Sequence, residues 1–98
     1  METKVKDINF KQAAIYRYWS LSPALQRKTR KLLSLAKRNL HDEQLKGLIR
    51  PMADPDRTLY VISLNEDLRI VIEVGDKIFR AVDILSMEMA RMYFGTPA

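Results

Sequence analysis

Three short apolar runs joined by tight polar turns constrain the fold of this chain more than any other feature. The runs cover residues 59–64, 68–74 and 77–84, and the turns between them are Asn65-Glu66-Asp67 and Gly75-Asp76. Short runs rich in Val, Ile and Leu, bounded by Asn, Asp and Gly, are typical of β-strands joined in hairpins. The second half of the chain is therefore expected to form a three-stranded antiparallel meander.

The middle run of this meander has two unlike faces. Side chains alternate across a strand, so every second residue shares a face. One face carries the apolar residues Leu68, Ile70, Ile72 and Val74, and the other carries the mixed set Arg69, Val71 and Glu73. We expect the first face to be buried and the second, with its arginine, to be open to solvent or to a partner.

A first helix is expected over residues 10–19. Phe10, Ala14 and Tyr18 recur at a spacing of four in a segment without Gly or Pro, which indicates one helical face. Tyr18 and the neighbouring Trp19 are expected to pack in the core.

A second helix is expected from Pro23 to about Asn39. Ser22 is a good N-cap, and proline fits the first helical position, where its missing N–H is not needed. The short link between the two helices predicts an antiparallel helical hairpin. The apolar stripe of the second helix comprises Leu25, Thr29, Leu32, Leu33, Ala36 and Leu40.

The remaining segments carry weaker signals. Residues 1–9 are expected to form a short edge strand, and residues 39–57, with two prolines and several aspartates, are expected to be a loop. Ser86 is a candidate N-cap for a short C-terminal helix over residues 87–94, followed by a frayed tail over residues 95–98.

This order of elements predicts an α+β fold. Two consecutive helices cannot both connect parallel strands, so they should pack together on one face of a small antiparallel β-sheet. With the short C-terminal helix, residues 1–98 form one expected domain. An antiparallel sheet tolerates a solvated second face, and Arg69 is expected to stand there.

The composition excludes several kinds of site. There is no cysteine and one histidine, His41, so disulfides, thiolate sites and histidine-built metal sites are not expected, and no cofactor is predicted. No apolar run approaches the roughly 20 residues that span a bilayer, and the N-terminus lacks the apolar core of a secretory signal. We expect a cytoplasmic protein without a membrane partner.

Charge is distributed unevenly along the chain. The net charge is +5, but residues 1–50 carry +8 and residues 51–98 carry −3. A basic helical half favours an anionic partner such as a nucleic acid, although a solvated helix face is the ordinary alternative. The candidate nucleic-acid-binding residues on the second helix are Lys28, Lys31 and Arg38.

Four segments resemble the RelE/ParE superfamily of bacterial toxins, which has HigB as a branch. Residues 23–32 resemble its basic second helix, and Leu45-Lys46-Gly47-Leu48 resembles the segment that leads into its sheet. Residues 64–70 resemble the hairpin with a recurring Asn and Arg, and Val82-Asp83-Ile84 resembles the end of its last strand. The similarity covers about residues 20–93.

The resemblance implies the toxin of a type II toxin–antitoxin system, inhibited by a cognate antitoxin protein. Many members of the superfamily cleave mRNA in the ribosomal A site, whereas ParE-like members poison DNA gyrase. The resemblance assigns Arg69 to the sheet arginine that holds a scissile phosphate and Lys46 to the loop lysine.

Cleavage of RNA without a metal needs a base for the 2′-hydroxyl, an acid for the leaving oxygen, and cations for the phosphorane. The histidine found after the last strand in HigB-type members is missing here, so Glu88 is the candidate base and Tyr93 the candidate acid. Arg50 and Arg80 are further candidates for binding nucleic acid.

Three functions remain open at this point. The first is a ribosome-dependent mRNA endonuclease, and the second is a ParE-like or degenerate toxin that acts by binding alone. The third is a non-toxic basic module that binds nucleic acid. The simplest structural role for Arg69 is an ion pair with Glu73 on the same face, which is worth little when exposed.

Overall fold

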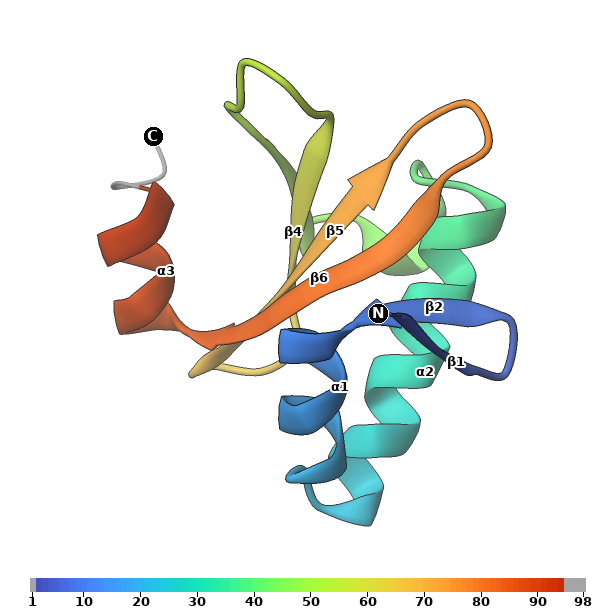
Figure 1. Ribbon diagram of the computed structural model, residues 1–98, viewed down its shortest axis with the longest axis vertical. Helices are drawn as coiled ribbons and strands as arrows, with labels where there is room; N and C mark the ends of the chain where they lie inside the picture. The colour runs from blue at the N-terminus through green and yellow to red at the C-terminus, as the bar shows by residue number, and fades with distance from the viewer. Residues whose placement is uncertain (1, 95–98) are drawn as a thin grey trace.

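The computed structural model describes residues 2–94, with side chains described up to Met92. Within this range six strands form one sheet in the order β1-β2-β6-β5-β4-β3 (Figure 1). The elements are β1 (Glu2–Val5), β2 (Ile8–Lys11), α1 (Gln12–Trp19), α2 (Pro23–Arg38), a 3₁₀ turn (Glu43–Leu45), β3 (Ile49–Met52), β4 (Leu59–Ser63), β5 (Leu68–Val74), β6 (Phe79–Ser86) and α3 (Met87–Phe94).

The predicted meander is confirmed. Strands β4, β5 and β6 are consecutive and antiparallel, and Ile70 of β5 lies opposite Ile62 on one side and Ile84 on the other. The β4–β5 turn is closed by Asn65, whose Oδ1 accepts hydrogen bonds from the N–H groups of Asp67 (2.9 Å) and Leu68 (2.7 Å). This use of an Asn side chain in place of a backbone acceptor explains why the turn needs no glycine.

The N-terminal segment differs from the prediction of a single edge strand. It is a hairpin, β1–β2, whose turn residues Lys6 and Asp7 both have positive φ, 45° and 68°. Such values at both central residues match the hairpin turn that follows the natural strand twist. Strand β2 then pairs in parallel with β6, with Asn9 opposite Arg80. The expectation of a purely antiparallel sheet was therefore wrong, because β2 and β6 are joined through both helices and the meander.

A further strand lies within the segment that was expected to be a loop. Strand β3 pairs antiparallel with β4, and Pro51 lies opposite Tyr60. Proline cannot donate to a strand ladder, so it is confined to edges and bulges. Since β3 is at the edge of the sheet, its proline is tolerated, and the proline signal misled the prediction.

Helices α1 and α2 both pack into the main core. Helix α2 has the bounds expected, and Ser22 Oγ accepts a hydrogen bond from Leu25 N at 3.3 Å. Helix α1 starts at Gln12 rather than at Phe10, which belongs to β2 and is fully buried. The buried members of the main core are Ile8, Phe10, Ala14, Ile15, Tyr18, Leu32, Leu33, Leu35, Ala36, Leu45, Ile62, Leu64, Ile70, Ile72, Ala81 and Ile84.

The two aromatic residues at the end of α1 have opposite environments. Tyr18 is buried, with its ring centroid 5.1 Å from that of Phe10, and its hydroxyl accepts a hydrogen bond from Arg30. Trp19 is 56% exposed, so its predicted core position was wrong. Successive residues of a helix point about 100° apart, and the narrow core stripe of α1 leaves Trp19 outside it.

A second apolar cluster lies on the other face of the sheet. Leu59, Val71 and Leu85 are buried there, and Met89 of α3 packs against them. The expectation that this face is open was wrong for this part of the sheet. Strand β6 leads directly into α3 (Figure 1), and Ser86 Oγ accepts a hydrogen bond from Met89 N at 3.1 Å. Met89 and Ala90 of this helix pack against the apolar side chains of this face.

No helix in residues 2–94 combines the length and apolar character that crossing a membrane requires. Across the same residues, His, Cys, Asp and Glu side chains do not gather in groups of three or more around a potential metal position.

Candidate nucleic-acid interface

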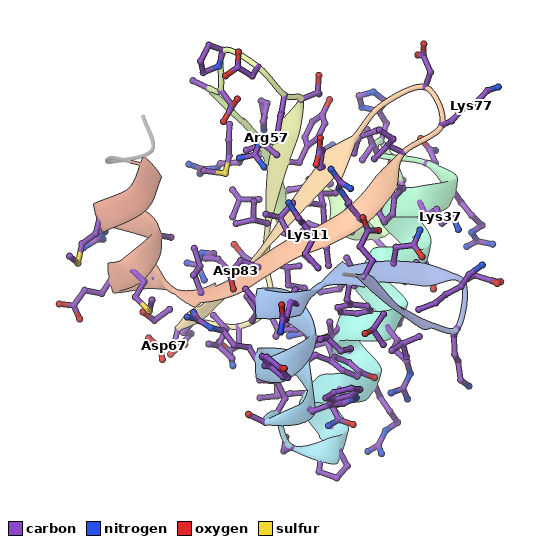
Figure 2. All side chains as sticks on the ribbon, viewed as in Figure 1. Lys11, Lys37, Arg57, Asp67, Lys77 and Asp83 are labelled. Carbon is purple, nitrogen blue, oxygen red and sulfur yellow. The ribbon has the colours of Figure 1, made fainter. Side chains whose placement is uncertain are left out.

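Arg69 lies near the start of β5, on the face opposite α1 and α2. Its Nη1 donates to the carbonyl oxygens of Asn65 (2.7 Å) and Leu68 (3.0 Å), and its Nη2 donates to Sδ of Met87 at 3.3 Å. The backbone N–H of Met87 in turn donates to the carbonyl of Asp67, which is labelled in Figure 2, at 2.7 Å. The β4–β5 turn and the start of α3 are thus tied together around this guanidinium. The arginine is thereby fixed in place by neutral groups.

No carboxylate of a described residue lies within ion-pair distance of Arg69, so the ion pair considered with Glu73 is not formed. Glu73 is instead opposite Arg80 in the β5–β6 register and accepts a hydrogen bond from its Nε at 2.8 Å. Strand register, which a single sequence does not reveal, decides this pairing. Arg69 consequently keeps a positive charge that no acidic side chain in residues 2–92 neutralises.

Arg80 is in the opposite situation. Besides Glu73, it donates from Nη1 to Glu2 Oε2 at 2.6 Å, which ties β1 to β6. The hydrogen bond to Glu73, followed by that to Glu2, raises the pKa of the Arg80 guanidinium. Two carboxylates thus engage the charge of this predicted nucleic-acid-binding residue, and its role in joining the strands is evident.

Two of the other predicted cations lie in or just before the edge strand β3, and the register places one of them, Arg50, on the face of Arg69. Arg50 of β3 is exposed and lies opposite Val61, which lies opposite Val71, so Arg50 shares the face of Arg69. Lys46 is exposed at the end of the 3₁₀ turn. It precedes Gly47, whose φ of +80° is available to glycine at little cost and lets the chain turn into β3.

The candidate acid and base both lie on α3. Glu88 is exposed in its first turn, next in sequence to the Met87 that contacts Arg69. Tyr93 belongs to the last turn of the helix, and its side chain lies outside the described part of the chain. Helix α3 therefore places Glu88 just after β6, next in sequence to the methionine that contacts the arginine. The role of Tyr93 stays a prediction.

The basic residues of α2 are on another side of the molecule. Lys28, Lys31 and Arg38 are all exposed, while Thr29, Leu32, Leu33, Leu35 and Ala36 of the same helix are buried in the core. Since α2 covers the face of the sheet opposite Arg69, the fold separates the predicted cations into two groups. A short nucleic-acid strand cannot contact both groups of cations without wrapping around the sheet.

Sequence reasoning missed Arg17 and Lys11. Arg17 of α1 reaches β6 and α3: its Nε lies 3.6 Å from Asp83 Oδ1, and its Nη1 donates to the Ile84 carbonyl at 3.0 Å and to Met89 Sδ at 3.7 Å. Lys11, at the junction of β2 and α1, lies along β6 with Asp83 nearer α3 (Figure 2). In the sequence, Arg17 lies next to the apolar stripe of α1 without belonging to it, and this position was the only sign that its side chain could reach the sheet.

Hydrogen bonds within its loop lower the pKa of one further carboxylate, that of Asp54. Asp54 Oδ1 accepts hydrogen bonds from the N–H groups of Asp56 (2.9 Å) and Arg57 (3.0 Å), and Arg57 Nη2 lies 3.5 Å from Asp54 Oδ2. These contacts, with the Asp56 hydrogen bond the largest cause, lower the pKa of Asp54. They stabilise the β3–β4 connection and lie outside the group around Arg69.

Comparison with known proteins identifies the fold. No family model matches the chain, and no curated protein matches its sequence. Among solved structures, the archaeal RelE–RelB complex from Pyrococcus horikoshii OT3 contains a similar chain, with a TM-score of 0.64 and 17% sequence identity. The match covers 79% of this chain and 89% of that one. The α+β fold of this protein is therefore RelE-like, as the sequence resemblance implied.

Proposed function

We propose that this protein is the toxin of a type II toxin–antitoxin pair and that it acts on RNA through the sheet face that carries Arg69. The observation that carries the proposal is the guanidinium of Arg69, fixed by backbone carbonyls and left without a carboxylate on a RelE-like sheet. The similar solved chain is in complex with RelB, which supports a cognate antitoxin as a partner. In this proposal residues 1–98 are one toxin domain, and α1 and α2 form its antiparallel helical hairpin.

The chemistry follows from the donors that remain on Arg69. A guanidinium has five N–H donors in a planar fork, and the backbone carbonyls occupy only Nη1. Met87 Sδ accepts from one N–H of Nη2, which leaves the N–H of Nε and the second N–H of Nη2 to bind a phosphate in the bidentate manner that arginine favours. Arg50 on the same face and Lys46 at its edge add positive charge, which would stabilise the phosphorane formed during cleavage.

The finer proposal is a ribosome-dependent mRNA endonuclease that acts in the cytoplasm. Glu88 would accept the proton of the 2′-hydroxyl, and Tyr93 would protonate the leaving oxygen. The exposed cations of α2 (Lys28, Lys31 and Arg38) would contact a second segment of polyanion on the other side of the molecule.

Induced expression in growing bacteria tests this function. Wild-type protein should stop growth and produce new 5′ ends in mRNA on translating ribosomes. Arg69→Gln should lower the rate of mRNA cleavage at least 100-fold and restore growth, because transition-state charge stabilisation by one group is worth about that factor or more. Arg27→Gln, at an exposed position on α2, is the matched control and should behave as wild type. Cleavage by folded Arg69→Gln at the wild-type rate would refute the assignment.

A second candidate is a ParE-like toxin that acts by binding alone. It is favoured by the surroundings of Arg69, where the contacts are carbonyl groups and a methionine, and where Leu85 across the sheet and Val71 two residues along β5 are apolar. This candidate predicts growth arrest without new mRNA ends, and inhibition of DNA gyrase in a supercoiling assay. Normal supercoiling together with mRNA cleavage would exclude it.

A further inference from the structure

A shallow open groove runs between the outer side of α1 and strand β6. Its volume is about 830 Å³, and its lining includes Lys11, Gln12, Tyr16, Val82 and Asp83. Binding sites for small molecules commonly have volumes of about 300–1,000 Å³. We propose that this groove is a base-reading subsite, which takes one unpaired nucleobase of the RNA and prefers a base with an exocyclic amino group. The proposal rests on the proposed action on RNA and specifies what part of the RNA is read.

Tyr16 gives the groove a stacking surface. Its side chain is 59% exposed, on the side of α1 away from the buried Ala14, Ile15 and Tyr18. Its hydroxyl accepts a hydrogen bond from Gln12 Nε2 at 3.1 Å, one turn earlier in α1. Proteins that read single-stranded RNA stack unpaired bases on exposed aromatic rings of this kind.

Asp83 gives the groove its preference among bases. Its Oδ1 accepts from the N–H of Ile84 at 2.8 Å and lies 3.6 Å from Nε of Arg17, whereas Oδ2 has no partner among the described residues. A carboxylate oxygen only accepts hydrogen bonds, so it favours the amino groups of adenine, cytosine and guanine. Uracil offers only its N3–H, and the two carbonyl oxygens that flank this donor repel a carboxylate, so uracil is disfavoured.

The groove and Arg69 are close enough to serve one RNA strand. Asp83 lies opposite Val71, and Arg69 is two residues from Val71 on the same face of β5. Diagonal neighbours of this kind are about 7–8 Å apart at the backbone. Lys11 lines the same groove and makes no ion pair with a described residue, so its ammonium group is available for a neighbouring phosphate.

The single tryptophan makes the site directly observable. Trp19 is the only tryptophan in the chain, is 56% exposed, and lies one helical turn after Tyr16. Fluorescein-labelled hexamers of A, C and U, titrated into the full chain at low salt, give Kd from anisotropy, while Trp19 quenching reports binding beside α1. We expect A6 and C6 to quench Trp19 and to bind about tenfold more tightly than U6, since one good base contact is worth about that factor.

Three variants test the assignment. Tyr16→Ala should weaken A6 binding about tenfold, and Tyr16→Phe, which keeps the ring, should bind as wild type does. Asp83→Asn should bring the Kd values for A6 and U6 together, because an amide both donates and accepts. Equal binding of A6 by wild type and Tyr16→Ala, unchanged preference in Asp83→Asn, or absence of hexamer binding would each overturn the subsite.

These results are separable from the test of the proposed function. If Arg69→Gln abolishes mRNA cleavage while Tyr16→Ala binds and cleaves as wild type does, the subsite is wrong and the function stands. If Tyr16→Ala and Asp83→Asn behave as expected while Arg69→Gln remains fully active, the groove reads bases but the site assigned to Arg69 is wrong.

Discussion

The apolar cluster beneath α3 can be tested by replacing Val71 with alanine. Val71 is fully buried on the face that the sequence suggested was open, beside Leu59 and Leu85 and under Met89. The change removes two carbons, worth about 1.6 kcal/mol at about 0.8 kcal/mol for each buried group. The cavity left behind and the lower β-propensity of alanine add to this, so we expect a loss of about 2–3 kcal/mol in the free energy of unfolding. For a chain of this size, that lowers Tm by about 10–20 °C.

Urea unfolding followed by circular dichroism gives the measurement, with the m-value checked for constancy. Helix α3 supplies matched methionines as controls: Met89 packs on the cluster, whereas Met92 is 80% exposed. Met89→Ala should cost about 1–2 kcal/mol and Met92→Ala less than about 0.5 kcal/mol. Because Val71 and Met89 belong to one cluster, their double variant should depart from additivity by about 0.5–1 kcal/mol.

A cost below about 0.5 kcal/mol for Val71→Ala, together with equal effects of Met89→Ala and Met92→Ala, would refute the reasoning. In that case α3 would not stabilise this face, and the surface around Arg69 would be an uncovered sheet.

Two further predictions concern loops. Gly47 has φ of +80°, and no atom lies within 4 Å of the position that a Cβ would take there. Gly47→Ala should therefore lower the free energy of unfolding by about 1–2 kcal/mol through backbone strain alone. Gly75→Ala, whose Cβ would meet only ordinary contacts with Ile78, should be nearly neutral in the same urea assay. The pKa of Asp54 is lowered, first by the N–H of Asp56, so its carboxylate stabilises the fold above its ordinary pKa and this contribution disappears as the pH falls through the lowered value. Asp54→Asn should therefore be less stable than wild type at neutral pH, with a gap that closes in strong acid; a gap independent of pH would contradict this.

Local patterns in the sequence were sufficient for the elements whose signals are local. The alternation over residues 68–74 and the Asn and Gly turns beside it predicted the meander, and Ser22 followed by Pro23 located the start of α2. Ser86 likewise caps α3 as expected. Alternation, turn chemistry and capping each depend on a few consecutive residues, so one sequence contains them fully.

The site was predictable only in part, because some of its contacts join residues that are far apart in the chain. The face of Arg69 followed from alternation, but the partner of Glu73 depended on the β5–β6 register, which aligned it with Arg80. The groove could not be foreseen, because Tyr16 and Asp83 come from segments far apart in the chain.

The sequence by itself determined that two helices precede a meander and that Arg69 lies on the mixed face of its middle strand. The face of Arg69 follows from the two-residue period of a strand alone. The tertiary structure decided that β2 joins β6 in parallel, that β3 forms an edge despite Pro51, and that α3 covers part of the second face. Each of these depends on contacts between residues distant in the chain, whose energies arise only when the packed elements exclude water between them.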